Sequence, residues 1–240
     1  MLRALIWDVD GTVAETERDG HRVAFNRAFA EAGLPWRWDV AEYAELLEVT
    51  GGRERILAYL QRRGDAPAGE AEREALAGRL HPRKNAFYAD LVAQGGIGAR
   101  PGVLRLMDEC RAEGVALAIA TTTSRANVEA LFASLLGVDW QTRFAAVVCA
   151  EDAPDKKPHP QAYQLALQRL GVGAEEAFAL EDSPNGLTAA RAAGIACGVN
   201  RSAYFAQARF EGAAWVRDDL DAAPPVTPAT LRAALRCVAN

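Results

Sequence analysis

The chain has 240 residues, of which 50% are hydrophobic and 25% are charged, and its formal net charge is −5. This composition indicates a globular protein of one large or two moderate domains, and it excludes disordered and strongly basic, nucleic-acid-binding classes. No apolar run approaches the length of a membrane span. The first predicted strand begins at Leu2 and leaves no room for a signal peptide. We therefore expect a cytoplasmic monomer without nucleic-acid or membrane partners.

Four cysteines lie far apart and form no Cys-X-X-Cys pair, so the sequence does not support a zinc site. They are Cys110, Cys149, Cys197 and Cys237. Cys149 and Cys197 fall in apolar runs, which favours an inert place in the core and a reduced cytoplasm as the compartment.

The opening stretch, residues 2–12, is an apolar run that ends in Asp8, Asp10 and Gly11. A run of this length, bounded by glycine, is typical of a buried strand. Residues two apart on an extended segment face the same side, so the two carboxylates are expected to repel unless a cation joins them. A hard cation with oxygen ligands, Mg²⁺, is the natural candidate. The alternative is an exposed Asp-X-Asp-Gly turn after an ordinary strand.

Residues 15–96 predict helices and no strand. Apolar periodicity and glycine stops place helices over 18–32, 39–47, 52–63 and 69–92, the last with a possible break at His81-Pro82. The glycine-rich stretch 94–102 reads as a linker. Because some eighty residues are too many for an ordinary connection, we predict an inserted all-helical domain over 15–96. It should hang over Asp8 and Asp10 as a lid.

From Pro101 onward, helices and strands alternate. Strands are expected over 115–120, 144–149, 177–180 and 195–199, with a short one at 214–216. Helices are expected over 102–113, 124–136, 159–170 and 184–193, and a last helix follows Thr227. This alternation predicts an α/β fold, with a Rossmann-like parallel sheet built from 1–14 and 97–240.

Polar residues follow three other predicted strands. Thr121 ends one strand, Glu181 and Asp182 end another, and Lys157 follows a third just before a proline and a helix. Each has a local alternative, because Thr121 can start a helix turn, Glu181 to Pro184 resembles a capping sequence, and lysine is usually solvated. Together they predict one site, because the carboxyl ends of parallel strands share an edge of the sheet.

These residues resemble the four motifs of the haloacid-dehalogenase superfamily, in its order and spacing. The motifs are Asp8-Val9-Asp10-Gly11-Thr12, Thr121, Lys157-Pro158 and Glu181-Asp182-Ser183. The early helical insertion resembles the subclass with a helical cap. Within it the chain is similar to the CbbY-type sugar-phosphate phosphatases of the Calvin cycle, through residues 8–17, 50–55, 120–124, 156–158 and 180–183.

The resemblance implies a phosphatase mechanism. Asp8 would be the nucleophile that forms an aspartyl-phosphate, and Asp10 the acid and base. Mg²⁺ would be held by the Asp8 carboxylate, the Asp10 carbonyl and Asp182, with Glu181 helping directly or through water. Thr121, Lys157 and backbone donors at Thr122 would hold the phosphoryl oxygens. The presence of Asp10 favours phosphoryl transfer, since the superfamily's dehalogenases lack it.

The cap residues expected to face the substrate are those that match the family's sugar-binding positions. They are Glu17, His21, Tyr43, Gly51, Gly52, Arg53, Arg55 and Lys84. The alternative for each is a solvated helix face, and for His21 a place against the core at the hinge. Relative to the family pattern, this chain carries one extra residue between Glu17 and His21.

The substrate implied by the resemblance is a small phosphorylated sugar, xylulose 1,5-bisphosphate, which would become xylulose 5-phosphate. Three alternatives remain open. A phosphomutase like β-phosphoglucomutase would pass the phosphoryl group to a bound sugar instead of water. A phosphatase like phosphoglycolate phosphatase would take a smaller ester. A non-catalytic sugar-phosphate-sensing module would be expected to lose Asp8, Asp10 or Lys157, and all three are present.

Overall fold

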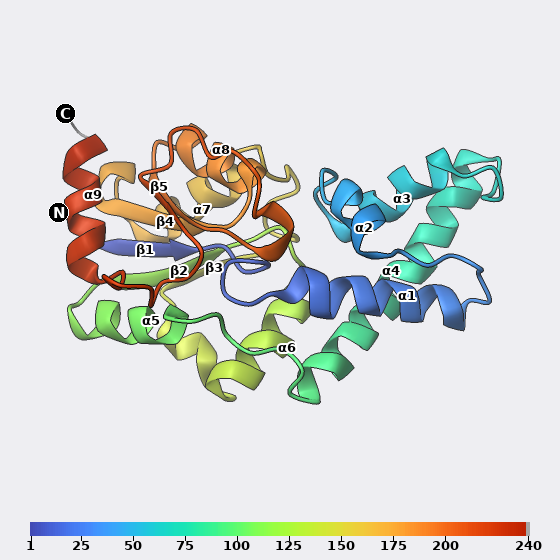
Figure 1. Cartoon of the computed structure of the whole chain (residues 1–240), viewed down its shortest axis with the longest axis horizontal. Helices are drawn as coiled ribbons and strands as arrows, with labels where there is room; N and C mark the ends of the chain where they lie inside the picture. Colours follow the sequence, from blue (N-terminus) through green and yellow to red (C-terminus); the bar gives the residue numbers. More distant parts are fainter. Residues whose placement is uncertain (239–240) are drawn as a thin grey trace.

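The computed structural model describes residues 1–238 and builds them around a parallel sheet with helices on both faces (Figure 1). The strand order is β3-β2-β1-β4-β5-β6. The strands are β1 (Ala4–Trp7), β2 (Ala116–Ala120), β3 (Ala146–Val148), β4 (Ala177–Glu181), β5 (Ala196–Asn200) and β6 (Trp215–Arg217). The order reverses between β1 and β4, and ligands of such sheets bind at the carboxyl ends beside this reversal. The predicted α/β fold is confirmed.

Alternation along β1 divides the core between the two faces of the sheet. Leu5 and Trp7 pack with the helices on one face, α5 (Val103–Ala112), α6 (Arg125–Leu136) and α9 (Pro228–Val238). Ala4 and Ile6 pack on the other face with α7 (Gln161–Leu170) and α8 (Pro184–Ala192) (Figure 1). Alanine also dominates the neighbouring strands on this second face, which lets α7 and α8 approach closely. Short 3₁₀ turns complete this part: η2 (Trp140–Arg143), η3 (Ala174–Glu176) and η4 (Ala203–Phe205).

The segment between β1 and β2 is helical, as predicted, and no strand occurs within its described residues 15–96. It forms η1 (Glu17–His21), α1 (Arg22–Glu31), α2 (Val40–Leu46), α3 (Gly52–Arg62) and α4 (Glu70–Ala93). These helices enclose an apolar cluster of their own, rich in aromatic rings such as Phe29, Trp38 and Tyr59. Ala14 and Ala99 pair where the chain enters and leaves, so the two crossings lie side by side. The domain boundaries at 15 and 96 remain a prediction.

The possible break at His81-Pro82 is absent, because α4 continues through Pro82 over 24 residues. A proline deprives the carbonyl four residues earlier of its helical partner. That residue is Gly78, and both Gly78 and Pro82 are exposed, so water can replace the lost hydrogen bond. The helix therefore tolerates this proline.

The helix expected over 18–32 is instead two elements, a π-helical turn η1 followed by α1. The Arg22 N–H donates to the Glu17 carbonyl, five residues back, where an α-helix would use the fourth. A π-turn accommodates one more residue than an α-turn. The π-turn lies in the segment between Glu17 and His21, where the family resemblance predicts one extra residue.

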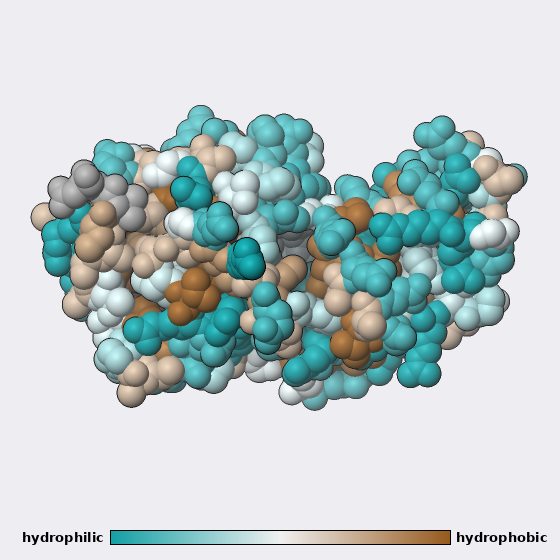
Figure 2. Space-filling model, turned by 45° about the horizontal axis from the view of Figure 1, so that its top comes forward, coloured by the Kyte–Doolittle hydropathy of each residue, from teal (hydrophilic) through white to brown (hydrophobic). Residues whose placement is uncertain are grey.

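Hydrophilic residues cover most of the face in Figure 2, and a notch separates the lobe built on the sheet from the lobe of inserted helices. Among the residues whose exposure the structure describes, the exposed large apolar ones are scattered along the chain: Met1, Val40, Val138 and Val216. None of the described helices is both long enough and apolar enough to cross a membrane.

Candidate active site

The carboxyl end of β1 places Asp8 and Asp10 at the edge of the sheet, and Gly11 turns the chain away. Gly11 has a φ of 88°, which favours glycine, and a Cβ there would lie 2.1 Å from Oδ2 of Asp182. Arg100 fixes the turn from outside by donating to the carbonyls of Gly11 and Asn200. The glycine is therefore what allows the end of β4 to approach the end of β1.

Three buried carboxylates meet at this edge. Carboxylate oxygens of Asp8, Glu181 and Asp182, called the acidic cluster below, lie within 4.8 Å of one another. Burial raises the pKa of Asp8 to about 7, with Glu181 adding to the rise and Lys157 opposing it. Burial, Asp8 and Glu181 raise the pKa of Asp182 well above its usual value. This donor set fits a divalent cation with oxygen ligands, because a cation would remove the mutual repulsion.

Lys157 supplies the one buried lysine cation at this edge among the described residues. Its Nζ donates to Asp8 Oδ1 at 2.7 Å, to Glu181 Oε1 at 2.6 Å and to the Ala120 carbonyl at 2.9 Å. Burial opposes its charge, but the two carboxylates outweigh burial and raise the pKa of Lys157. The solvated-surface alternative for this lysine is therefore wrong, since only 5% of it is exposed.

Tyr163, which the sequence did not single out, bonds the same oxygen of Glu181 as Lys157 does. Its hydroxyl donates to Glu181 Oε1 at 2.6 Å, and its ring centroid lies 4.9 Å from Lys157 Nζ. A Cβ on Gly186 would come within 1.9 Å of Glu181 Oε2, so α8 also presses on this carboxylate. Ser183 caps α8 by accepting from the Gly186 N–H at 3.1 Å. The prediction that residues 181–184 include a helix cap is therefore confirmed for Ser183. Asp182, by contrast, belongs to the acidic cluster.

Thr121 follows β2 and is buried against the same edge. Its N–H donates to the Val148 carbonyl at 3.0 Å, and its Oγ1 accepts from the Thr123 N–H at 3.2 Å. Helix α6 begins only at Arg125, so Thr121 lies in the loop before the helix. The loop of residues 121–124, called the threonine loop below, ends at Ser124.

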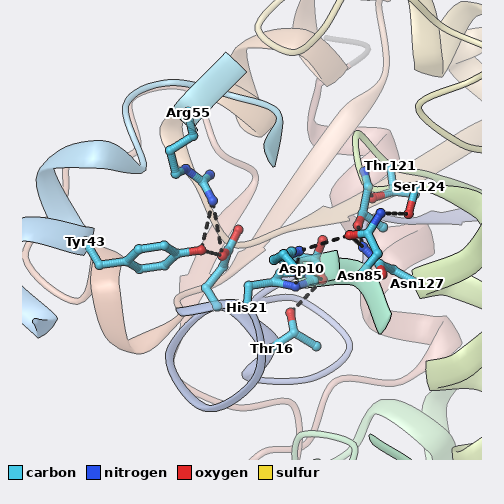
Figure 3. A network of polar contacts seen from close by, with 12 residues as sticks. Asp10, Thr16, His21, Tyr43, Arg55, Asn85, Thr121, Ser124 and Asn127 are labelled. Atoms are coloured by element: carbon cyan, nitrogen blue, oxygen red, sulfur yellow. Dashed lines mark hydrogen bonds and ion pairs between the residues drawn. The ribbon is translucent and has the colours of Figure 1, made fainter. Parts of the chain in front are cut away.

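Asp10 points its side chain toward Thr16 and His21, at the start of the inserted helices (Figure 3). Its Oδ1 accepts from Thr16 Oγ1 at 2.6 Å and lies 3.0 Å from His21 Nε2. Lys84 Nζ lies 2.9 Å from His21 Nδ1. An ammonium group can only donate, so we assign the proton of a neutral His21 to Nε2, from where it bonds Asp10. Burial raises the pKa of Asp10, but His21, Thr16 and Lys84 outweigh it and lower the pKa below its usual range.

The π-turn and Tyr88 set the orientation of His21. The rings of Tyr88 and His21 stack at 4.2 Å. A Cβ on Gly20 would clash with the Tyr88 ring at 2.8 Å, so this stack needs glycine beside His21. Burial lowers the pKa of Lys84 to about 8, although Glu17 and Asp10 oppose the change. Thr16, Gly20 and Tyr88 were missed by sequence reasoning, because only packing connects them with the aspartates.

A second cluster from the inserted helices lies beyond His21. The Tyr43 hydroxyl donates to Glu17 Oε2, and Arg55 Nη1 donates to the Tyr43 hydroxyl at 2.8 Å (Figure 3). Arg55 also donates to the Leu46 carbonyl at 3.1 Å and is only 6% exposed. A solvated helix face is therefore wrong for Arg55 and Tyr43. Arg53 differs, because its side chain is 45% exposed and pairs with Glu74.

A cavity of about 90 Å³ lies between the sheet edge and the inserted helices. Most of the predicted site residues line it, whereas Arg53, Tyr43 and Glu181 do not. Tyr43 contacts the lining residues Glu17 and Arg55 through its hydroxyl. The lining residues are Asp8, Asp10, Glu17, His21, Leu47, Thr50, Gly51, Gly52, Arg55, His81, Lys84, Thr121, Thr122, Thr123, Asn127, Lys157, Asp182, Ser183, Asn185 and Phe205. Asn127, Asn185 and His81 were not predicted, since isolated amide and imidazole side chains carry no local signal.

Comparison with known proteins places the chain in a family. A model described as haloacid dehalogenase-like hydrolase matches residues 2–194. Protein CbbY (plasmid) of Cupriavidus necator is 46% identical over 226 residues, which cover 94% of this chain and 89% of that protein. The chain therefore belongs to the haloacid dehalogenase-like hydrolases and, within them, to the CbbY proteins. The predicted enzyme class, a phosphatase, is confirmed.

Two solved structures match almost the whole chain. The crystal structure of CbbY from Rhodobacter sphaeroides in complex with phosphate has a TM-score of 0.89 at 41% identity, covering 97% of this chain and 100% of that chain. A mutant of that protein in complex with xylulose-(1,5)bisphosphate has a TM-score of 0.88 at 40% identity, covering 96% and 99%. The fold and the arrangement of elements are thus those of a known phosphate-binding protein.

Proposed function

We propose that the chain is a Mg²⁺-dependent sugar-phosphate phosphatase that converts xylulose 1,5-bisphosphate into xylulose 5-phosphate. The observation that carries the proposal is the separation of the two aspartates. Asp8 faces Lys157 and the acidic cluster, whereas the Asp10 side chain faces His21 and the inserted helices. This separation supports one role for Asp8 at the phosphorus atom and another for Asp10 at the leaving oxygen. The related structure with xylulose-(1,5)bisphosphate supports the choice of substrate.

The reaction would proceed in two displacements at phosphorus. An oxygen of Asp8 attacks the phosphorus, the bond to the sugar oxygen breaks, and Asp10 gives that oxygen a proton. Asp10 then takes a proton from a water molecule that attacks the aspartyl-phosphate, which releases phosphate and restores Asp8. Because His21, Thr16 and Lys84 lower the pKa of Asp10, the arrangement in this structure favours its ionised, base form. It therefore suits the second displacement.

The acidic cluster would hold the metal through the Asp8 carboxylate, the Asp10 backbone carbonyl and Asp182. Bound there, Mg²⁺ would offset the repulsion between the carboxylates and an incoming phosphate. Glu181 Oε1 already accepts hydrogen bonds from Lys157 and Tyr163. This favours metal binding by Glu181 through a water molecule over direct coordination. Lys157, the Thr121 hydroxyl and the Thr122 N–H would bind the phosphoryl oxygens, because the N–H groups of Thr121 and Thr123 already donate within the protein.

The inserted helices would recognise the sugar and its second phosphate. Arg55 is a buried cation on the cavity wall, and Glu17 beside it offers carboxylate oxygens to sugar hydroxyls. Gly51 and Gly52 line the cavity and bring the start of α3 toward it. We leave Arg53 out of this set, because Glu74 already pairs with it at the surface. The scattered apolar surface residues support a monomer, which size-exclusion chromatography would test.

The test is phosphate release from a panel that contains xylulose 1,5-bisphosphate, phosphoglycolate and β-glucose 1-phosphate, with and without Mg²⁺. We expect the bisphosphate to be the best substrate, to yield xylulose 5-phosphate, and to need the metal. Isomerisation of glucose 1-phosphate without free phosphate would instead establish a phosphomutase. Tight binding of a phosphate ester without turnover of any would support the sensing module.

A further inference from the structure

Two amide side chains join the inserted helices to the sheet beside the cavity. Asn127, in the first turn of α6, donates through Nδ2 to Thr123 Oγ1 at 3.1 Å and to Asn85 Oδ1 on α4 at 3.3 Å. Asn85 Nδ2 in turn lies 3.5 Å from Ser124 Oγ. Figure 3 shows Asn85 reaching from the inserted helix toward Asn127 and Ser124. Asn85 thus contacts the threonine loop directly at Ser124 and, through Asn127, at Thr123.

Asn127 is an unusual residue for such a junction. It is only 3% exposed, and its Oδ1 has no hydrogen-bond partner among the described residues. A buried carbonyl without a partner is costly, and an apolar side chain would pack there without that cost. Asn127 lines the cavity, whereas Asn85 does not. A contribution to folding stability alone does not account for the amide pair. Positioning of the adjacent threonine loop accounts for it better.

The pair also lies between the two halves of the site. Asn85 follows Lys84, which contacts His21 and through it Asp10. On the other side, Thr123 receives a bond from Asn127 and donates its own N–H to Thr121 Oγ1. Lys84 Nζ itself lies 3.5 Å from Asn85 Oδ1. Polar contacts thus run from the lysine of the inserted helices to the threonine of the sheet edge.

We propose that Asn85 and Asn127 form an amide latch that holds the threonine loop in its phosphate-binding conformation when the inserted helices are in place. The inference rests on the proposed function, which assigns this loop to the phosphoryl oxygens. Both are positioning residues, because they act through Thr121 and Thr122. The latch makes phosphate affinity depend on Asn85, a residue that does not line the cavity.

The test is calorimetric titration of inorganic phosphate, with Mg²⁺ present, into the full chain and its variants. Asn85→Ala and Asn127→Ala should each weaken phosphate binding about tenfold, and the double variant should also lose about tenfold, because either change opens the same latch. Asn85→Asp keeps the acceptor for Asn127 and should bind within about threefold of the unchanged protein. Asp90→Ala, an exposed change on the same helix, is the matched control.

Turnover supplies the second readout. Each alanine variant should raise the KM for the sugar phosphate more than it lowers kcat. Should an alanine variant fail to fold, Asn85→Leu replaces the amide by an apolar group of similar size and should give the same loss. Unchanged phosphate affinity in the single variants, or a double variant near one hundredfold weaker, would overturn the latch. If the unchanged protein binds phosphate but hydrolyses no ester, the proposed function fails while the binding test still decides the latch.

Discussion

The sheet edge and the inserted helices build their halves of the site in different ways. At the sheet edge, Asp8, Thr121 and Asp182 follow strands whose positions are fixed by parallel pairing. In the inserted helices, Glu17, Tyr43 and Arg55 come from separate helices and hold one another through their own side chains. The first half is set by backbone geometry and the second by side-chain contacts. Changes at the edge should therefore affect every substrate, whereas changes in the helices should affect some substrates more than others.

The largest effect is expected for Asp8→Asn at the sheet edge. The amide is a poor nucleophile, so phosphate release should fall by about 10⁴-fold or more for every ester. Folding should be spared, because the amide oxygen can still accept from Lys157. Burial already raises the pKa of Asp8 to about 7, so removing its charge should leave the melting temperature unchanged or higher. A purified Asp8→Asn protein that retained turnover would disprove the nucleophile assignment.

A smaller loss is expected for Lys84→Met in the inserted helices. The change removes the cation at His21 Nδ1 and with it the fixed proton on the nitrogen that faces Asp10. We expect kcat to fall about 10²-fold, the lower range for a disturbed acid–base pair, with a smaller change in KM. Arg83→Met, an exposed change on the same helix, is the control. Equal kcat values for both variants would show that Lys84 does not act through His21.

Sequence reasoning succeeded where the chain order alone brings residues together. Asp8 and Asp10 directly follow β1, and Lys157 and Asp182 each follow a predictable element. The expectation that the two aspartates face the same side is wrong, because Asp8 contacts Lys157 whereas Asp10 contacts His21. These local signals also predicted the parallel sheet and the helical insertion. The order of strands in the sheet carries no comparable local signal, because it depends on how the helices pack.

The missed residues meet the site only through packing. Tyr163 lies on a helix face that reads as ordinary core, and nothing nearby in sequence connects it with Glu181. Asn127 lies inside the helix predicted over 124–136, and its contact with the site depends on Asn85, which is 42 residues away. The π-turn before α1 likewise carries no local signal, because it forms beside the stack of His21 on Tyr88.

An intermediate effect is expected for Tyr163→Phe beneath the sheet edge. The change removes the hydroxyl that donates to Glu181 but keeps the ring against Lys157. Loss of one hydrogen bond to a charged group corresponds to about tenfold, and we expect that loss in kcat/KM for all esters. Tyr59→Phe, in the apolar core of the inserted helices, should leave kcat/KM unchanged. A loss confined to one substrate would place Tyr163 with substrate selection instead.

The smallest effect concerns stability in acid. Burial, with Lys84, lowers the pKa of His81 from 6.5 to about 4. As the pH falls from 6.5 to about 4, His81 is protonated in the unfolded chain but not in the folded chain. The free energy of unfolding therefore decreases over this range, and the contribution of His81 that is present above pH 6.5 is lost by about pH 4. In the His81→Gln variant, the free energy of unfolding should fall by about 2 kcal/mol less between pH 7 and pH 4.5 than in the unchanged protein. Urea unfolding at pH 7 and pH 4.5 would measure it, and identical pH profiles would contradict the assignment.

The division of labour between the two halves is tested most directly by Arg55→Gln. The measurement is kcat/KM for xylulose 1,5-bisphosphate and for phenyl phosphate, an ester without a second phosphate. Because Arg55 is proposed to bind that second phosphate, kcat/KM should fall about 10²-fold for the bisphosphate, the loss of a charge-assisted contact, and stay within about twofold for phenyl phosphate. Equal losses for both esters would contradict the account, since Arg55 would then serve the chemistry and not the choice of substrate.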